Sequence, residues 1–521
     1  MADPVVATRY GSLRGAEHDG VLSFLGIPYA ASPTGVARFS PPQPPDPWGA
    51  TFDATSVGAI APQPTSLLGG YVPGDPNDQS ESCLTMNVFT PAVDDGRRPV
   101  LVFVHGGAFL IGTGGGVMYR GEALARRGVV VVTFNYRLGA LGFLAHPDLA
   151  ATPGAPFANW GVLDQIAALE FVRDHVASFG GDPANVTLFG ESAGAMSTAN
   201  LLAVPKAAPL FRRAILESGA TAVLSVGQAA HNAERFAKAL GLDRIDRERL
   251  CHVPLDEVLA AQATLFGDLG VGAVMPFQPV VDGHLIPDHP DALIAAGGGS
   301  IEALIVGTNR DEFRFFTIGH RQLDEATDDA LAPYVSAYLP PTDALGAADV
   351  ISGYRAIATS RGETPSGRQL FEAIAGDAVF WAPAMRLAAA SARHRPTFVY
   401  RFDWTSPFMR GALGACHGLE LPFVFGTITN PFVALFSGEG EQAGALCEAV
   451  QSAWVSFATH GVPGTSETVA WPRYDDERRS TLVFDDDPSV LERPREDERK
   501  LWEALLGQYG VSATTETTTG T

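Results

Sequence analysis

The feature that most constrains the fold is a serine set among small residues directly after a short apolar run. Val186 to Phe189 is followed by Gly190-Glu191-Ser192-Ala193-Gly194, and Ala193 to Leu202 can leave this turn as a helix. A sharp turn between a strand and a helix holds a serine hydroxyl exposed beside a base. Composition alone would give roughly 0.3 chance matches to this pattern, and an ordinary glycine-rich turn is the alternative. The rest of the chain therefore has to decide between an exposed serine nucleophile and an ordinary glycine-rich turn.

Short apolar runs alternate with longer helical stretches along much of the chain. Between two of the runs, Gly161 to Phe179 has helical spacing, and it ends at the turn residues Gly180 to Pro183. Such runs are typical of strands buried on both faces of a parallel sheet, joined by helical connections. The runs are Val100 to Val104, Val129 to Val132, Val186 to Phe189, Leu304 to Val306 and Phe398 to Phe402. We predict an α/β fold with a large, mostly parallel central sheet flanked by helices.

Two segments interrupt this alternation, at about 226–296 and about 319–395, and both have mainly helical character. We predict that they are insertions over the C-terminal edge of the sheet, where α/β proteins bind ligands. The sequence shows no internal repeat and no Pro/Ser-rich linker. We therefore expect one elaborated domain over residues 1–510, followed by a disordered tail at 511–521.

The charge balance limits the classes of partner. The chain has 36 Lys and Arg against 58 Asp and Glu, a net charge of -22. This field repels nucleic acid and anionic membranes, so we expect neither as a partner. The four cysteines lack zinc-type spacing, and there is no P-loop or dinucleotide fingerprint, so we predict no metal and no cofactor. The first fifteen residues lack an apolar signal region, which favours a cytoplasmic protein.

A serine nucleophile also needs oxyanion donors, a base and an acid that orients the base. The glycine-rich loop after Val104 offers the N–H groups of Gly107 and Ala108, and the turn offers that of Ala193. His105 leads this loop and is interpreted as structural. Four late histidines fit the chain order of base after acid, and the loop position favours His417; the others are His320, His394 and His460. The acid follows the strand at Leu304 to Val306, where Asp311 and Glu312 remain equal alternatives.

Together these residues resemble the type-B carboxylesterase and cholinesterase family, and most of all its bacterial carboxylesterases of the para-nitrobenzyl esterase type. The resemblance covers about residues 26–474. It is carried by ordered motifs: Gly26 to Ala30, Arg38-Phe39, Ser80 to Val88, His105 to Phe109, Asn135 to Arg137, Asn159 to Gln165, Phe179 to Pro183, Gly190 to Gly194, Asn309 to Glu312, His417 to Gly426 and Trp471 to Tyr474.

The resemblance implies an α/β-hydrolase fold and a role for each matching residue. Ser192 matches the nucleophile, His417 the base and Glu312 the acid, which decides against Asp311. The oxyanion donors match Gly107, Ala108 and Ala193. Glu191 and Ser218 match residues that support the site, and Arg38 with Glu81 and Arg137 with Asp164 match structural ion pairs.

Several departures from the family pattern are informative. The cysteine that pairs with Cys83 in secreted relatives is replaced by Ala61, so we expect Cys83 to be unpaired, as in a reducing compartment. No tryptophan occurs between Trp48 and Trp160, so the cation–π site of cholinesterases is missing. Small or flexible residues near Ala273 and Met275, together with Phe313 behind the acid, are the predicted substrate pocket.

The resulting hypothesis is a serine carboxylesterase that hydrolyses small, uncharged carboxylic esters through an acyl-enzyme intermediate, as a monomer or homodimer. One alternative is a specialised hydrolase with the same triad, acting on a carbamate, amide, polyester or toxin ester. A second alternative is a non-catalytic adhesion or scaffold protein, since members of the same fold serve that role.

Overall fold

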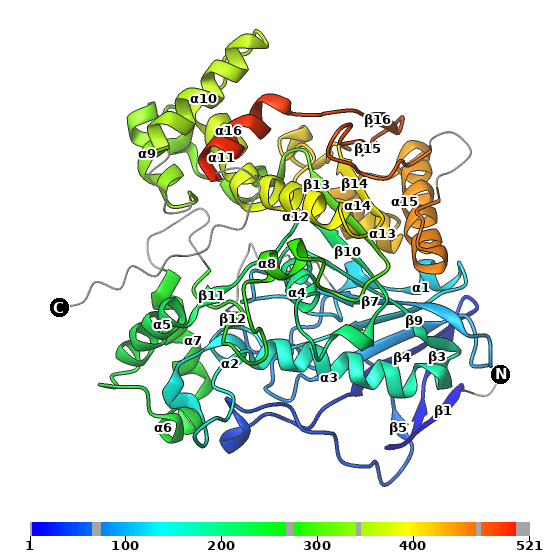
Figure 1. Ribbon diagram of the computed structural model, residues 1–521. Helices are drawn as coiled ribbons and strands as arrows, with labels where there is room; N and C mark the ends of the chain where they lie inside the picture. The colour runs from blue at the N-terminus through cyan, green and yellow to red at the C-terminus, as the bar shows by residue number, and fades with distance from the viewer. Residues whose placement is uncertain (1–2, 65–73, 267–274, 340–344, 465–469, 507–521) are drawn as a thin grey trace.

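The computed structural model describes residues 3–64, 74–266, 275–339, 345–464 and 470–506. Within these ranges the largest sheet has eleven strands, in the order β16-β15-β14-β13-β10-β9-β7-β8-β6-β4-β3, with helices on both faces (Figure 1). The strands from β15 to β8 in that order are parallel, and antiparallel pairs lie at both ends. The predicted α/β architecture with a mostly parallel sheet is confirmed.

All five predicted apolar runs lie in this sheet. They belong to β7 (Arg98–Val104), β8 (Val130–Phe134), β9 (Gly181–Glu191), β13 (Ala303–Asn309) and β14 (Thr397–Phe402). Every residue of β8 and β13 is buried. Both faces of the sheet are covered by helices. These strands are therefore continuous apolar runs and do not alternate between apolar and polar residues.

The sequence analysis missed β10 (Arg213–Glu217), which lies between β9 and β13. Its apolar part is only Ala214 to Leu216, with a charged residue at each end. Both charged side chains are nevertheless buried, because Arg213 bonds the Ala458 carbonyl oxygen and Glu217 accepts from Trp454. Because these partners are distant in the chain, the residues around β10 give no indication that its charged ends are buried.

The remaining strands are short or lie toward the edges of the sheet. β1, β2 and β5 form a separate small sheet, and β11 pairs with β12. Their bounds are β1 (Val5–Thr8), β2 (Gly11–Arg14), β3 (Ala16–His18), β4 (Val21–Pro28), β5 (Phe52–Asp53), β6 (Thr85–Thr90), β11 (Leu224–Ser225), β12 (Val280–Val281), β15 (Thr481–Phe484) and β16 (Ser489–Leu491).

Both helices predicted near the serine are present. The first is α3 (Trp160–His175), continued by a 3-10 turn and stopped at Gly180, and the second is α4 (Ala193–Leu201). The other helices that lie outside the two predicted insertions are α1 (Glu122–Ala125), α2 (Gly139–Phe143), α13 (Leu421–Phe425), α14 (Pro431–Ser437), α15 (Glu441–His460) and α16 (Glu496–Leu506).

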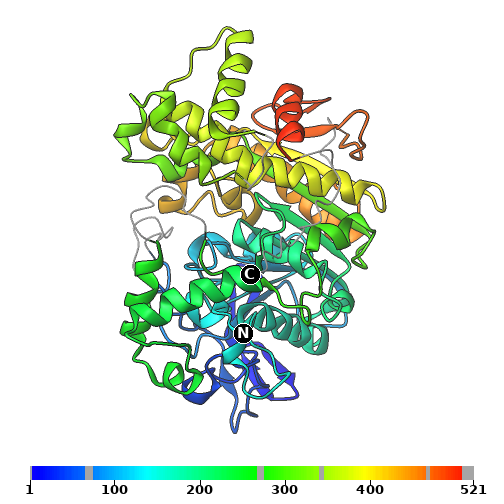
Figure 2. The same cartoon turned by 60° about the vertical axis from the view of Figure 1, so that its left-hand side comes forward.

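The two segments that interrupt the alternation are mainly helical, as predicted. In Figure 1 α5 to α7 lie at the lower left and α9 to α11 at the upper left, whereas α8 and α12 lie near the centre, and Figure 2 turns the left-hand side forward. The helices of the two segments are α5 (Val226–Ala239), α6 (Arg247–His252), α7 (Leu255–Phe266), α8 (Pro290–Ala295), α9 (Asp328–Ser336), α10 (Ala347–Ser360), α11 (Gly367–Gly376) and α12 (Ala382–Ala392). That residues 1–510 form one domain stays a prediction.

The serine turn requires close contact between α4 and the sheet. A Cβ atom on Gly194 would overlap the carbonyl oxygen of Val104 at the end of β7. Only glycine allows this approach without a shift of the backbone. The final glycine of the pentapeptide is therefore needed to bring the start of α4 against the ends of β7 and β9.

Both ion pairs expected from the resemblance are present, and they fix loops next to the sheet. The Arg38 guanidinium donates to both oxygens of Glu81 at 2.6 Å. Arg137 donates from Nε and Nη2 to Asp164 at 2.7 Å, and both side chains are buried. All four cysteines are free and buried, so the prediction that Cys83 is unpaired is also confirmed.

In the described parts of the chain, no helix combines the length and the apolar character needed to cross a membrane.

We predict that Asp164→Asn destabilises the fold. The substitution keeps the side-chain shape but leaves the Arg137 charge buried without a counter-charge, a change that costs about 3–5 kcal/mol. The variant should unfold at a clearly lower urea concentration, measured by tryptophan fluorescence. Arg173→Gln is the control, because it breaks an exposed pair with Asp174 and should leave the midpoint almost unchanged. Equal midpoints for the two variants would contradict this role of the buried pair.

Candidate active site

Ser192 lies in a strained turn at the carboxyl end of β9. Its backbone has φ 56° and ψ -125°, a conformation that non-glycine residues rarely adopt. Its N–H donates to the Glu217 carbonyl at the end of β10, and its carbonyl accepts from Met196 in α4. Ser192 is half-buried, whereas Glu191 and Ala193 on either side are buried. The turn therefore leaves the serine as the accessible residue of the three.

The loop after β7 supplies backbone donors beside this turn. Gly107, Ala108 and Phe109 have consecutive positive φ values of 108°, 55° and 59°. A Cβ on Gly107 would overlap the Ile111 carbonyl oxygen, so this turn requires glycine. Among the described residues, no acceptor bonds the N–H of Gly107, Ala108 or Ala193. These groups remain available for an anionic ligand.

His417 and Glu312 are brought together from loops that follow two neighbouring strands. Glu312 follows β13, and His417 lies in the loop between β14 and α13. The two side chains meet at 2.7 Å between His417 Nδ1 and Glu312 Oε2. The other oxygen, Oε1, accepts from Ser218 Oγ at 2.6 Å and from the Asn309 N–H at 2.7 Å. Three donors hold this carboxylate, which fixes the ring that it contacts.

The two acidic residues left open by the sequence have different surroundings. Asp311 forms an ion pair with Arg314 at 2.9 Å and accepts from the Ala415 N–H at 2.9 Å. Its carboxylate therefore holds the loop that leads to His417. Glu312, by contrast, contacts the imidazole itself.

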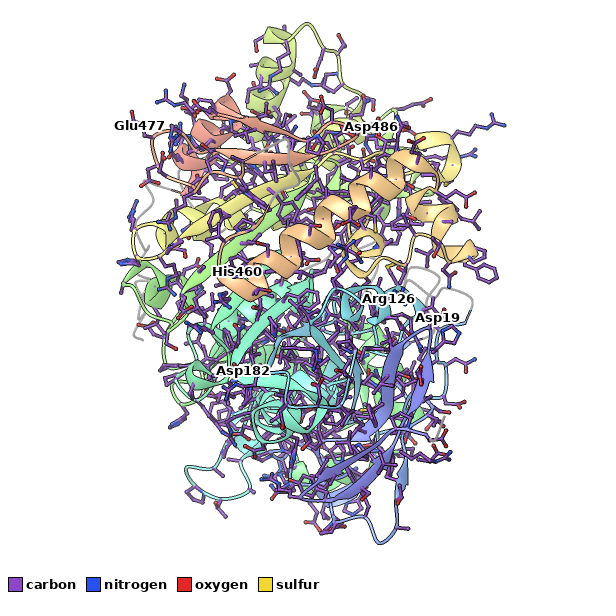
Figure 3. All side chains as sticks on the ribbon, turned by 90° about the vertical axis from the view of Figure 1, so that its right-hand side faces the viewer. Asp19, Arg126, Asp182, His460, Glu477 and Asp486 are labelled. Carbon is purple, nitrogen blue, oxygen red and sulfur yellow. The ribbon has the colours of Figure 1, made fainter. Side chains whose placement is uncertain are left out.

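The other candidate histidines lie elsewhere. His394 is exposed and bonds the Ala295 carbonyl, and His460 is exposed at the end of α15 on the surface (Figure 3). His320 interacts with Gln322. His105 stacks on Tyr136 with ring centroids 4.5 Å apart, and burial lowers its pKa to about 4. These environments indicate structural roles for the four histidines.

The Nε2 atom of His417 faces Glu191 at 3.1 Å. In the described residues it has no hydrogen-bond partner in good geometry, so the structure does not join His417 directly to the Ser192 hydroxyl. A lone pair on Nε2 would repel the Glu191 carboxylate at this distance. The charge of Glu191 therefore favours a proton on Nε2, and such a proton has to leave before the ring can act as a base.

The surroundings of His417 are unusually rich in buried carboxylates. Burial raises the pKa of Glu191 to about 7, and burial with the charges of Glu191 and Glu312 raises that of Glu420 to about 8. Burial also raises the pKa of Glu217 well above its usual range. Although burial alone lowers the pKa of the His417 imidazole, the charges of Glu191 and Glu312 outweigh it and raise the pKa to about 9.

Aromatic side chains cover the imidazole. The Phe380 ring lies 4.4 Å from the His417 ring and the Phe316 ring lies 5.2 Å from it, measured between centroids. Phe313 is buried behind them and packs on Phe316 at 5.0 Å. Such a covering keeps water from one face of the ring.

The predicted pocket residues are only partly accounted for. Phe313 reaches the imidazole through Phe316 and Phe380, without contacting the ring itself. Met275 is half-buried and packs against the core, and Ala273 lies outside the described residues. That these residues line a substrate pocket stays a prediction.

The described ranges contain no group of three or more His, Cys, Asp or Glu side chains able to hold a metal ion.

Sequence reasoning missed Phe316, Phe380, Glu217 and Glu420 as neighbours of the site. The sequence signal for Glu420 was its position three residues after His417, which is one helical turn, but its burial could not be deduced. Glu420 accepts from Asn309, which also donates to the Cys416 carbonyl and so links the loops after β13 and β14. No comparable signal identifies Phe380, which lies in another part of the chain.

Comparison with known proteins gives a consistent result over nearly the whole chain. The model of the carboxylesterase family matches residues 2–502. Para-nitrobenzyl esterase of Bacillus subtilis (strain 168) is 38% identical over 506 residues, covering 96% of this chain and 98% of that protein. Phenmedipham hydrolase of Pseudarthrobacter oxydans is 34% identical, covering 94% and 97% of the two chains.

Solved structures agree. A carboxylesterase of Geobacillus stearothermophilus, EST55, superposes with a TM-score of 0.85 at 38% identity, covering 96% of this chain and 99% of that one. A para-nitrobenzyl esterase structure gives a TM-score of 0.82 at 37% identity, with coverage of 96% and 99%. The α/β-hydrolase fold expected from the sequence is therefore confirmed.

We predict that Glu191→Gln lowers the pKa of the His417 imidazole. The substitution removes the negative charge 3.1 Å from Nε2, and this charge favours the protonated ring. An NMR titration of the ring, assigned by its disappearance in His417→Gln, measures the change. Glu372→Gln is the matched control, because this half-buried carboxylate bonds Thr317 and should leave the titration unchanged. An unchanged or higher pKa in Glu191→Gln would contradict the stabilising contact.

Proposed function

The chain belongs to the carboxylesterase family and is a carboxylic ester hydrolase, and on this premise we propose that it hydrolyses uncharged esters through Ser192, His417 and Glu312. The observation that carries the proposal is the 2.7 Å contact between His417 and Glu312, close to a strained and accessible serine. A serine in such a turn needs a nearby base, and a base needs an acid to fix its orientation.

The reaction begins when His417 Nε2 accepts the proton of the Ser192 hydroxyl. Ser192 Oγ then bonds to the carbonyl carbon of the ester, and the carbonyl π electrons move onto oxygen. The N–H groups of Gly107, Ala108 and Ala193 stabilise this oxyanion, each by about 3 kcal/mol. As the carbonyl re-forms, the alcohol leaves with the proton from His417, and the acyl group stays on Ser192.

Water completes the cycle by the same route. His417 accepts a proton from water, the hydroxide oxygen bonds to the acyl carbon, and the acid leaves as Ser192 regains its proton. Throughout, Glu312 keeps the Nδ1 proton of His417 directed toward itself, so that Nε2 is the atom that exchanges the proton with Ser192 and water. The hydrogen bonds from Ser218 and Asn309 support this role, because they stabilise the charged carboxylate.

The proposed substrates are neutral because of the charge around the site. Glu191, Glu217, Glu312 and Glu420 are buried, and an acidic substrate would be repelled by those that are ionised. The apolar rings of Phe316 and Phe380 are suited to an apolar group of the ester. Relatives of similar identity are named for different substrates, among them phenmedipham and fumonisin B1, so identity alone does not select one ester.

We expect Ser192→Ala to abolish hydrolysis of p-nitrophenyl esters and labelling by organophosphates, while the far-UV circular dichroism spectrum stays unchanged. The variant loses the atom that forms the acyl-enzyme bond, so the loss in kcat should be on the order of 10⁶-fold. Retention of full turnover in the folded variant would contradict the proposal.

We also expect Glu312→Gln and Asp311→Asn to differ sharply. Glu312→Gln keeps the shape but no longer fixes the imidazole tautomer, so kcat should fall about 10³–10⁴-fold. Asp311→Asn weakens only the pairing that holds the loop, so kcat should fall by less than about tenfold. Initial-rate kinetics on the same ester compare the two, and the opposite ranking would assign the acid to Asp311.

A further inference from the structure

A π-helix lies directly beside the proposed catalytic pair. Residues Asp377–Trp381 form it, between α11 and α12. Such i→i+5 turns are rare and are often found at functional sites. At its start, a Cβ on Gly376 would lie 3.6 Å from the Glu312 Cβ atom, and near its end the Phe380 ring lies 4.4 Å from the His417 ring. One turn of helix therefore contacts the neighbourhood of both residues.

The first residue of this turn is held by an ion pair that the ester reaction does not use. Asp377 is buried, and its two oxygens accept from Arg495 Nη1 at 2.7 Å and Nη2 at 2.6 Å. Its Oδ2 atom also accepts from the Tyr354 hydroxyl in α10. Two parallel hydrogen bonds between a planar guanidinium and a planar carboxylate fix the relative orientation of the two side chains as well as their distance. The position of the π-helix is thus set by Arg495.

Arg495 comes from the far end of the chain, one residue before α16. Its guanidinium also lies over the Trp381 ring, 4.5 Å from the centroid, at the other end of the π-helix. Its backbone has a positive φ of 58°, which is uncommon for a side chain of this size. In this conformation the half-buried Arg495 side chain reaches the buried carboxylate of Asp377.

The helix that follows is docked onto the same region. Figure 1 shows α16 beside α10 and α11. Glu498 pairs with Arg361, the residue after α10, at 2.7 and 2.8 Å, and Trp502 donates to the Tyr354 hydroxyl of α10 at 2.8 Å. The chain of contacts therefore runs from α16 through Tyr354, Arg495 and Asp377 to the π-helix.

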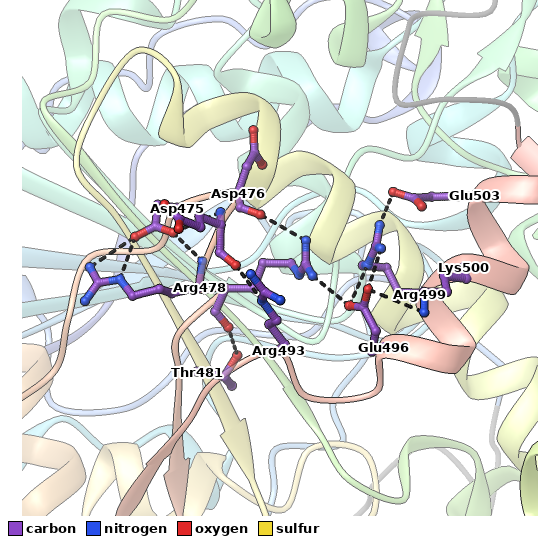
Figure 4. Close-up of polar contacts among 11 residues, drawn as sticks. Asp475, Asp476, Arg478, Thr481, Arg493, Glu496, Arg499, Lys500 and Glu503 are labelled. Carbon is purple, nitrogen blue, oxygen red and sulfur yellow. Dashed lines mark hydrogen bonds and ion pairs between the residues drawn. The ribbon is translucent and has the colours of Figure 1, made fainter. Parts of the chain in front are cut away.

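A second set of charges holds the outer side of α16. Glu496 accepts from Arg479 at 2.7 Å and from Arg499 at 2.8 Å, and Arg499 also pairs with Glu503 (Figure 4). These contacts join α16 to the turn before β15, away from the π-helix. They offer a matched control, because Arg499 lies in the helix that directly follows Arg495 and also carries an ion pair.

We propose that Arg495 and Asp377 are positioning residues, which fix the π-helix so that Phe380 holds the His417 ring in its reactive orientation. This inference rests on the proposed function, in which His417 is the base. Phe316 and Glu191 also lie beside the ring, but Phe380 is the nearer of the two aromatic rings, so a shift of Phe380 loosens the orientation of the imidazole about its contact with Glu312. A small displacement of a reacting group lowers the rate strongly, because the geometry of proton transfer is lost.

The test is a double-mutant cycle in the full-length enzyme with a p-nitrophenyl ester as substrate. Arg495→Gln should lower kcat about tenfold and change KM by less than about twofold, because Arg495 positions the base and does not contact the substrate. Arg495→Lys keeps the charge but not the two-pronged contact, so it should recover part of the rate. Arg499→Gln should change kcat by less than about twofold, since it removes ion pairs with Glu496 and Glu503 within α16 and leaves the Arg495–Asp377 pair in place.

The cycle is closed with Phe380→Leu. If Arg495 acts through Phe380, Arg495→Gln should lower kcat by less than about twofold in the Phe380→Leu background. A full tenfold loss in that background, or an unchanged kcat in Arg495→Gln itself, would overturn the inference. Should Arg495→Gln not fold, Tyr354→Phe replaces it, because this variant loses only the hydroxyl that bonds Asp377. In Tyr354→Phe, kcat should fall about threefold when Phe380 is present and should not fall in the Phe380→Leu background.

Ser192→Ala is assayed in parallel to separate the two proposals. Turnover that persists in Ser192→Ala contradicts the proposed function. Inactive Ser192→Ala with independent losses for Arg495→Gln and Phe380→Leu contradicts only the positioning role. Circular dichroism melts confirm that each variant is folded at the assay temperature.

Discussion

The parallel pairing of β9 with β7 and β10 is the constraint on which the rest of the site depends. In this register Gly190 lies beside Val104, and Glu191 lies beside Glu217. The carboxyl ends of adjacent parallel strands meet at one edge, so the serine turn, the glycine loop and the loop of the acid lie together. Close packing of Gly194 against β7 then holds the start of α4 against the sheet. Without this register, residues more than 200 positions apart in the chain would not form one site.

A second theme is the amount of negative charge buried around one imidazole. Glu191, Glu312 and Glu420 act on His417, and Glu217 neighbours two of them. Hydrogen bonds satisfy these carboxylates unequally: Glu312 accepts from three groups, whereas one oxygen each of Glu191, Glu217 and Glu420 finds no donor among the described residues. An unsatisfied buried carboxyl favours its protonated form. Burial therefore raises the pKa of these carboxyl groups next to the proposed base, and the charge of the site depends on several neighbouring groups.

The sequence predicted the sheet better than it predicted the surroundings of the proposed triad, and the reason is physical. Strands such as β7, β8 and β13 are covered on both faces, so each of them is a continuous apolar run that can be recognised in the sequence. The strand β10 has only three such residues, and its charged ends are compensated by partners hundreds of residues away. In the same way Phe380 belongs to a helical insertion, and no local pattern indicates that it packs on His417. Local signals report local structure, and these contacts are not local.

The sequence by itself determined the α/β architecture, the turn at Ser192, the family and the order of the proposed catalytic residues, because each depends on short-range patterns or on motifs along the chain. Only the tertiary structure distinguished the surroundings of Asp311 and Glu312, brought Glu191 to within 3.1 Å of His417, and connected α16 to the π-helix beside that ring. These features depend on which side chains meet across the sheet and the insertions, and such meetings are decided by packing in three dimensions. The serine was therefore visible in the sequence, whereas the environment that governs its base was not.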